Sequence, residues 1–299
     1  RSNLQRQGWA MELVLGQVEQ LSALLAVSRS ALVRDWDSLT LDRALEWARY
    51  FQHLYDRFRG RPQLREAVGR RLRRSQPSPL LGFSTLGRCP QLLGLALLEN
   101  RALPPAACRR LLVREAAGQP RWLCGVLEQL PQPRAFEVVA AALAVLKQGP
   151  GTEPAGGGSR DGSSLDQASA AGDGCTAGLL LSWLLDSQER FSAFCLCLPA
   201  SHLAFLAGHY SQLSRSYLDL LTRWGSHLIY DPLQGRWVKS CLDKAELSWE
   251  ELRQRFICLC QGSTLLKEQT QAALKLLRTQ DGDFNVRGIS VWTDLLMEV

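Results

Sequence analysis

The sequence of 299 residues lacks the short motifs that usually mark enzymes and metal sites. Its four histidines show no metal-ligand spacing, and no C-x-x-C, H-x₃-H, H-E-x-x-H, G-x-S-x-G or Gly-Lys-Ser/Thr pattern occurs. Two C-x-C pairs, Cys195/Cys197 and Cys258/Cys260, fall in helix-patterned segments. Residues two apart on a helix diverge by about 200°, so neither pair can share an ion. We therefore expect no metal, no cofactor, no small-molecule ligand and no catalysis.

Long apolar runs are also missing. No stretch reaches the roughly 18 uncharged residues of a membrane helix, and the nearest, Phe191–Gly208, is broken by Pro199. The chain does not start with a charged and then apolar signal segment. Nine irregularly spaced cysteines do not suit a disulfide framework. We expect no membrane insertion, and a reducing compartment, the cytosol or the nucleus.

Lysine is scarce, with 5 lysines against 30 arginines, and the net charge of +6 is uneven. Residues 1–148 carry 22 basic and 12 acidic side chains, whereas the remainder carries 13 and 17. A basic first half suits either nucleic acid or an acidic partner. The arginine bias along the whole chain also fits GC-rich coding sequence, so both interpretations stay open.

Eight arginines concentrate within 18 residues, opposed there by Glu66 alone. They are Arg57, Arg59, Arg61, Arg65, Arg70, Arg71, Arg73 and Arg74. We call them the basic cluster. A DNA contact here would be to phosphates rather than to bases. A solvated helix face or a nuclear import signal would have the same composition.

The segment 148–178 has no aromatic residue, one leucine and nine glycines. Such a composition cannot bury enough apolar surface to offset the entropy of ordering. It predicts a flexible linker between an N-terminal helical domain at 11–147 and a C-terminal helical domain at 179–299. Residues 1–10 lack helical periodicity and precede Met11, so they are interpreted as an extension.

Apolar residues recur at spacings of three and four through both domains, which predicts an all-α protein. In the first domain the expected helices are Glu12–Val27, Leu41–Phe58, Gln63–Arg74, Leu86–Leu103, a segment from Pro104-Pro105, Trp122–Leu130 and Arg134–Lys147. In the second they are Leu179–Leu185, Phe191–Leu198, Leu213–Leu228, a capping box at Ser248 opening a helix through Leu259, Leu265–Arg278 and Ile289–Met297. The pattern of residues 227–240 predicts a small β-hairpin. Consecutive helix pairs with short loops suggest a solenoid-like helical repeat.

The segment Leu41–Phe58 has the clearest apolar stripe. Its members are Leu41, Ala44, Ala48, Phe51, Tyr55 and Phe58, widened by Leu45, Trp47 and Leu54. Tyr50 falls on the other side with His53 beside it, and tyrosine is a favoured interface anchor. We expect Tyr50 and His53 to contact a partner; the alternative is that another helix covers this face.

Several stretches together resemble the Fanconi anemia group F protein family. They are LLAVS at Leu24–Ser28, RALEWARY at Arg43–Tyr50, LLENRAL at Leu97–Leu103, WLLDSQERFSAFCLCLPA at Trp183–Ala200, WEELRQRF at Trp249–Phe256 and QDGDFNVRGISVWTDLL at Gln280–Leu296. The similarity runs from Met11 to Leu296. Residues 1–10 and the linker have no counterpart in the family. A stretch that mammalian relatives carry is missing between about Arg114 and Trp122.

The resemblance implies a non-enzymatic adaptor of the nuclear Fanconi core complex, a ubiquitin ligase assembly in DNA interstrand crosslink repair. The first half would engage the C and E subunits, and the second, a helical-repeat domain, the G and A subunits. The protein would also help to recruit the complex's DNA translocase. The competing hypothesis is a nucleic-acid-binding helical protein that uses the basic cluster, which would bind with steep salt dependence.

The segment YFQHL resembles a family segment linked to the C and E subunits. The resemblance makes Tyr50, Phe51, His53 and Leu54 candidate partner-binding residues. Gln52 stands where the family has arginine, and Phe51 where it has an aliphatic residue.

Overall fold

A computed structural model describes residues 11–75, 81–118, 120–147, 176–240 and 247–299. Internal contacts divide the chain into two units, Arg1–Thr176 and Ala177–Val299. The regular secondary structure of the described residues is helical apart from one two-stranded sheet, which confirms the all-α prediction. The predicted extension and residues 148–175 of the predicted linker lie outside the described residues. The last three linker residues, 176–178, are helical instead.

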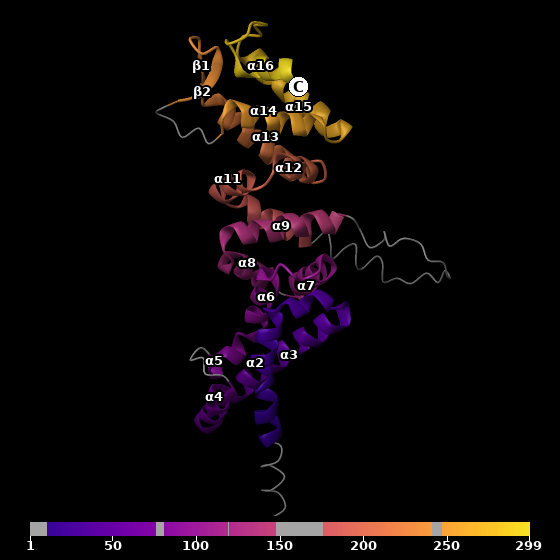
Figure 1. Ribbon diagram of the computed structural model, residues 1–299, viewed down its shortest axis with the longest axis vertical. Helices are drawn as coiled ribbons and strands as arrows, with labels where there is room; N and C mark the ends of the chain where they lie inside the picture. Colours follow the sequence, from indigo (N-terminus) through magenta and orange to yellow (C-terminus); the bar gives the residue numbers. More distant parts are fainter. Residues whose placement is uncertain (1–10, 76–80, 119, 148–175, 241–246) are drawn as a thin grey trace, which may run out of the picture. The chain divides into compact units, whose positions relative to one another are not determined.

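The first unit is built from short helices around one long helix, α3 (Figure 1). Its elements are a helix at 11–18, α2 (Gln20–Ser28), the 3₁₀ helix η1 (Ala31–Asp35), α3 (Ser38–Phe58), α4 (Pro62–Ser75), α5 (Phe83–Gly87), α6 (Cys89–Glu99), α7 (Pro105–Gly118), α8 (Pro120–Gln129) and α9 (Gln132–Lys147). Asp37 caps α3, because its carboxylate accepts a hydrogen bond from the Thr40 amide at 2.7 Å. Most of the predicted stripe is buried, Leu41, Ala48 and Phe51 among it, and α3 packs on α2, α5, α6 and α7.

The prediction of one helix over Leu86–Leu103 is wrong. The helix is interrupted at Arg88, between α5 and α6. Pro90 lies in the first turn of α6, where the backbone N–H that proline lacks would have no intrahelical partner. The helix then ends at Asn100, whose side-chain amide donates to the carbonyls of Ser28 and Ser30 at 2.9 and 2.8 Å. Those two hydrogen bonds hold the start of η1 against the end of α6.

Two glycines let helices of the first unit approach closely. A Cβ on Gly94 would lie 2.3 Å from the Trp122 ring, and a Cβ on Gly87 would lie 2.8 Å from the Tyr55 ring. Any side chain at either position would overlap an aromatic ring. Glycine therefore allows α8 to pack against α6, and α5 against α3.

The second unit consists of successive short helices and a hairpin. Its elements are a helix at 176–185, α11 (Gln188–Cys197), α12 (Ala200–Ala207), α13 (Ser211–Ser226), β1 (Leu228–Asp231), β2 (Arg236–Lys239), α14 (Trp249–Cys260), α15 (Thr264–Gln280) and α16 (Val291–Glu298). Helix α12 was not predicted; Pro199, expected only to end a helix, also serves as its N-cap residue. The predicted capping box at Ser248 is confirmed, with reciprocal bonds to Glu251.

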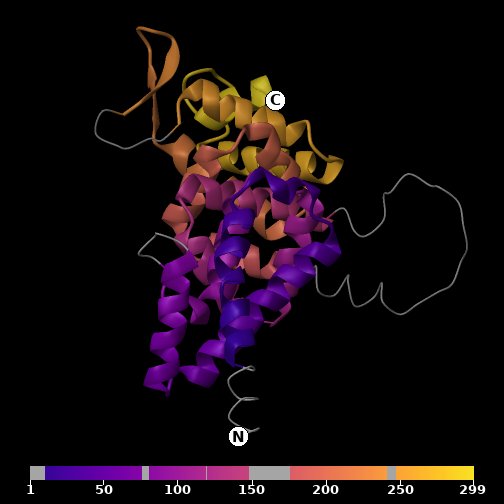
Figure 2. The ribbon, with the colours of Figure 1, turned by 60° about the horizontal axis from the view of Figure 1, so that its bottom comes forward.

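The predicted β-hairpin is confirmed, and it projects from the helices of its unit (Figure 2). Leu228 pairs with Lys239 and Asp231 with Arg236, and Gly235 takes a positive φ of 65° in the turn. The indole N–H of Trp237 donates to the Asp294 carboxylate at 2.7 Å. That carboxylate also accepts from the Gly288 amide, so the hairpin is fastened to the start of α16.

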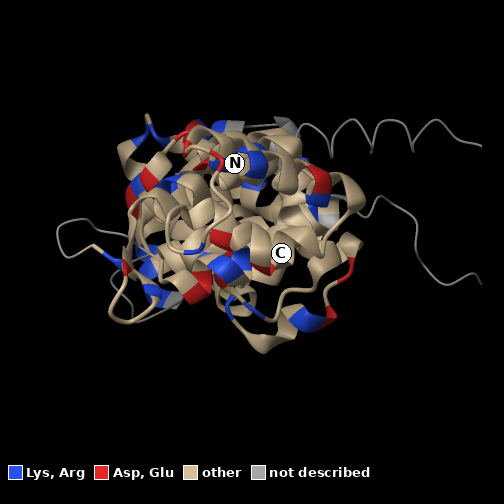
Figure 3. Cartoon of the chain, turned by 90° about the horizontal axis from the view of Figure 1, so that it is seen from above, with Lys and Arg blue, Asp and Glu red and all other residues tan. Residues whose placement is uncertain are grey.

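No described helix is long and apolar enough to cross a membrane. Charged residues of both signs are interspersed on the helices in the view of Figure 3.

Candidate partner-binding site

The four candidate residues of the YFQHL segment lie on α3 but differ in exposure. Phe51 is fully buried and Leu54 is 5% exposed, so both pack in the core. Tyr50 is half-buried and His53 is exposed. Because a buried side chain cannot reach a partner in the folded unit, Phe51 and Leu54 are structural residues, and only Tyr50 and His53 remain as surface contacts.

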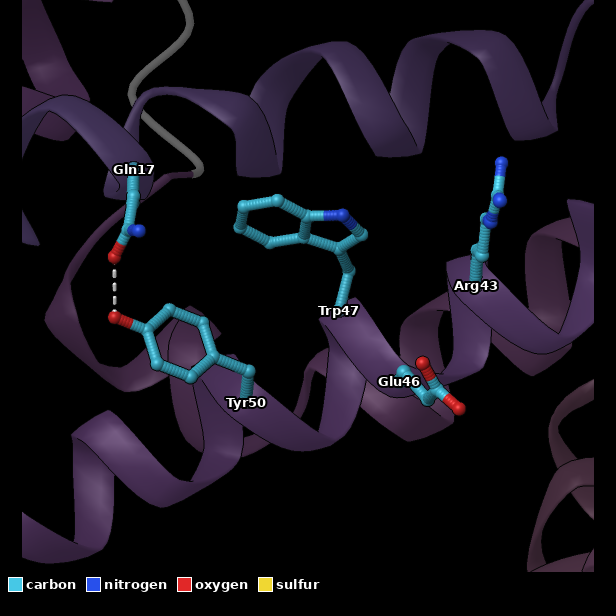
Figure 4. A pocket seen from close by; sticks show the side chains of 5 residues that line it. All are labelled: Gln17, Arg43, Glu46, Trp47 and Tyr50. Atoms are coloured by element: carbon cyan, nitrogen blue, oxygen red, sulfur yellow. Dashed lines mark hydrogen bonds between the residues drawn. The ribbon is translucent and has the colours of Figure 1, made fainter.

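The helix at 11–18 lies beside Tyr50 and covers part of it (Figure 4). The Tyr50 hydroxyl donates to the Gln17 side-chain oxygen at 2.5 Å. Partial desolvation raises the pKa of Tyr50. Neither prediction holds in full, since the Tyr50 hydroxyl bonds to a neighbouring helix while the residue also lines a surface hollow.

Trp47 lies at the surface, although the apolar pattern of the sequence placed it in the core stripe of α3. Its side chain is 38% exposed, and its ring meets that of Tyr50 edge-on with 5.8 Å between the centroids. The two rings line a hollow of about 290 Å³ together with Gln17, Arg43 and Glu46 (Figure 4). We call it the Trp47–Tyr50 hollow. Trp47 and Tyr50 are three residues apart and therefore lie side by side on a helix, so their spacing in the sequence was a signal for this pair of surface aromatics.

The Trp47–Tyr50 hollow has the chemistry of a protein interface. Tryptophan, tyrosine and arginine are the residues that dominate binding energy at such surfaces. The rings of Trp47 and Tyr50 offer a large apolar contact area at little cost in conformational entropy. Arg43 and Glu46 supply one charge of each sign beside them. The hollow therefore suits an apolar side chain of a partner protein, framed by polar contacts.

The structure does not bring Tyr50 and His53 into one site. His53 lines a second and larger hollow, of about 730 Å³, between α3, the start of α6 and the start of α8. Arg49 and Asp56 of α3 line it, and so do Arg88 and Arg121. A helical wheel put Tyr50 and His53 beside each other, but Tyr50 lines the Trp47–Tyr50 hollow and His53 lines the larger one.

The basic cluster divides into paired and exposed arginines. Arg71 is paired with Glu12 at 3.3 Å and with Glu19 at 2.6 Å, which ties α4 to the N-terminal helices. Arg70 lies 3.8 Å from Glu66, and Arg65 lies over the Phe83 ring. The exposed members are Arg57, Arg59, Arg61, Arg65, Arg70, Arg73 and Arg74. Arg71 therefore has a structural role, and DNA contact or nuclear import by the others stays a prediction.

Both C-x-C pairs lie in helices, α11 and α14, as predicted. Cys195 is buried while Cys197 is exposed, so the two thiols of that pair point to different sides of α11. Burial raises the pKa of Cys195, which keeps it a neutral thiol. Within the ranges that the structure describes, no three His, Cys, Asp or Glu side chains gather as metal ligands would.

Comparison with known proteins gives one family. The sequence model described as Fanconi anemia group F protein matches residues 11–116 and 112–299. The mouse protein named Fanconi anemia group F protein is 36% identical over 349 aligned positions, covering 96% of the chain and 97% of that protein. The human protein of the same name is 34% identical over 365 positions, covering 96% and 94%. Both alignments are longer than the chain, so both relatives carry residues without a counterpart here.

Proposed function

Because the chain belongs to the Fanconi anemia group F protein family, we propose that it acts in the Fanconi anemia pathway of DNA repair as a non-enzymatic adaptor. In this role it holds other subunits of the nuclear core complex, a ubiquitin ligase assembly for interstrand crosslink repair. The observation that carries the proposal is that the exposed Trp47 lies beside Tyr50 on α3, the long helix of the first unit.

The division into two units supports a bridging role. Each unit has its own apolar core, built around α3 in the first and around α13 and α14 in the second. We assign the C and E subunits to the first unit and the G and A subunits to the second, with the DNA translocase as a further partner. An adaptor needs at least two separate surfaces, and two units with separate cores provide them.

We assign the contact with the C and E subunits to the Trp47–Tyr50 hollow. An interface tryptophan of this kind contributes about 2 kcal/mol or more to binding, roughly a thirty-fold change in Kd. Its removal should cost less stability than the loss of a core residue, because Trp47 is 38% exposed, although its ring also packs on Phe51 with 5.5 Å between the centroids.

The test is the affinity of the purified chain for the C–E subunit pair, measured by calorimetry. We expect Trp47→Ala to weaken binding about thirty-fold, and binding of the A and G subunits to stay unchanged. Leu39→Ala is the matched control, since Leu39 is 54% exposed on the same helix but does not line the hollow. Wild-type affinity in a folded Trp47→Ala variant would exclude the hollow as the contact.

The exposed arginines at the end of α3 and along α4 favour a second candidate function, contact with a nucleic-acid backbone. A protein that neutralises several phosphates loses affinity steeply as salt rises, whereas an apolar interface does not. Duplex binding measured over a salt series separates the two. Charge reversal of Arg73 and Arg74 should abolish such binding if the second candidate is correct.

A further inference from the structure

The larger hollow beside α3, which contains His53, is a second binding site on the first unit. We call it the arginine hollow and define it by its charged members, Arg49, His53, Asp56, Arg88 and Arg121, together with Trp122. We propose that it binds an acidic peptide segment of a partner protein, with the segment's carboxylates held by Arg88 and Arg121. This site is separate from the Trp47–Tyr50 hollow and does not depend on what that hollow binds.

The charge of the arginine hollow is unbalanced. Among the described residues that line it, Arg49, Arg88 and Arg121 are basic and Asp56 is acidic, and Arg49 has an interaction of its own. Elsewhere in the unit several arginines have acidic partners, for example Arg110 with Asp42 at 2.6 Å and Arg134 with Glu137 at 2.9 Å. The guanidinium groups of Arg88 and Arg121 make no ion pair or hydrogen bond with any described side chain. Their forked N–H donors match the geometry of a carboxylate ligand.

Two helix ends add to the positive potential of the hollow. Arg88 directly precedes α6, with Pro90 in the first turn of that helix, and Arg121 is the second residue of α8. The start of a helix carries a partial positive charge and favours anions. No side chain caps the start of α6. Both helix starts lie at the hollow because Arg88, Pro90 and Arg121 line it.

Trp122 forms part of the wall of the arginine hollow. Its indole nitrogen is buried and has no hydrogen-bond partner among the described residues. A buried N–H without a partner is destabilising. The indole ring is held in place, since it packs on Gly94 with no room for even a Cβ between them. Because this nitrogen is closed to solvent, the indole ring serves as a fixed wall of the hollow and not as a donor to the bound carboxylate.

The shape and the polar lining favour a peptide over nucleic acid. A volume of about 730 Å³ is that of a site for a few side chains, whereas a duplex presents its phosphates along an extended rod. Asp56 can accept hydrogen bonds from the backbone amides of a peptide. Gln52 and Gln91, which also line the hollow, can bond peptide N–H and C=O groups.

The experiment measures binding of fluorescein-labelled octaglutamate to the full chain by anisotropy at low ionic strength, where screening is weak. We expect saturable binding that Arg88→Glu with Arg121→Glu weakens at least about tenfold. The matched control is Arg59→Glu with Arg61→Glu, which changes net charge equally outside the hollow and should change affinity less than about twofold.

Octalysine and a single-stranded DNA octamer serve as parallel probes. Octalysine should not bind in the hollow. Arg88→Gln with Arg121→Gln removes charge without reversing it, and should also weaken octaglutamate binding if the first pair of substitutions impairs folding. Absence of saturable octaglutamate binding, or equal weakening by the control pair, would overturn the proposal. DNA binding that is tighter than octaglutamate binding, and is lost on substitution of Arg88 and Arg121, would assign the hollow to nucleic acid instead.

Discussion

Gly94 and Gly125 lie within neighbouring helices, α6 and α8, and have opposite surroundings. A Cβ on Gly94 would overlap the Trp122 ring, whereas a Cβ on Gly125 would have no atom within 4 Å. We expect Gly94→Ala to lower the free energy of unfolding by about 1–3 kcal/mol through overpacking. Gly125→Ala should raise it by up to about 1 kcal/mol, because alanine is the better helix former. Urea unfolding of the two variants checks this, and stabilisation by both would show that Trp122 is free to move.

Three neighbouring side chains of α3 should differ in their effect on stability. Phe51 is fully buried, so Phe51→Ala should lower the free energy of unfolding by about 3–5 kcal/mol. Tyr50→Phe removes one hydrogen bond to Gln17 and should cost about 1 kcal/mol. His53→Ala changes an exposed residue and should stay within about 0.5 kcal/mol. Denaturant unfolding measures all three, and a loss for Tyr50→Phe as large as for Phe51→Ala would place Tyr50 in the core.

At the scale of elements, Asp42 joins α3 to α7. Its carboxylate accepts two hydrogen bonds from Arg110, at 3.1 and 2.6 Å, and one from Arg114 at 2.5 Å. The hydrogen bonds from Arg110 hold the pKa of Asp42 below its ordinary value; partial desolvation opposes them and Arg114 adds to them. The carboxylate therefore stabilises the folded state only while it is ionised.

The predicted consequence is a stability that depends on pH. Because the folded pKa of Asp42 is lowered, its contribution is fully present above the unfolded pKa and is lost as pH falls through the folded pKa. We expect Asp42→Asn to cost about 1 kcal/mol near neutral pH and little in acid. Unfolding measured from pH ~7 to pH ~3 checks this. Equal losses by Asp42→Asn at both ends of the range would mean that charge is not involved.

At the scale of the whole molecule, the second unit has the contents of an independent domain. Its buried aromatic side chains include Trp183, Phe191, Phe194, Tyr217, Trp224, Trp237, Phe256 and Trp292. Arg255 is buried among them and donates to the Tyr217 hydroxyl at 3.1 Å. Successive helices from α12 to α16 contact one another. A core of this size can fold without the first unit.

We expect a fragment of residues 176–299 to unfold in one cooperative transition. Circular dichroism and tryptophan fluorescence should give coincident curves, because its aromatic residues share one core. The Phe256 side chain is 1% exposed. Phe256→Ala should therefore disrupt that core and lower the free energy of unfolding by about 3–5 kcal/mol. A fragment without a cooperative transition would show that its core needs residues of the first unit.

The sequence by itself determined the elements whose causes are local. The apolar stripe and Asp37 define α3, Ser248 and Glu251 close the capping box, and the turn at Gly235 accompanies the hairpin. Each of these depends on residues a few positions apart, whose relation is fixed by the helix period or by a turn. The all-α class follows from the same local patterns.

Only the tertiary structure decided which faces of α3 are covered. A helical wheel gives the angle of a side chain but not the neighbour that meets it, so it placed Trp47 in the core and set Tyr50 beside His53. Gln17 lies 33 residues from Tyr50 along the chain, and Asn100 lies 72 residues from Ser28. Contacts over such separations depend on how the helices pack, and packing depends on side-chain shapes along several helices at once. The two hollows on α3 are products of that packing.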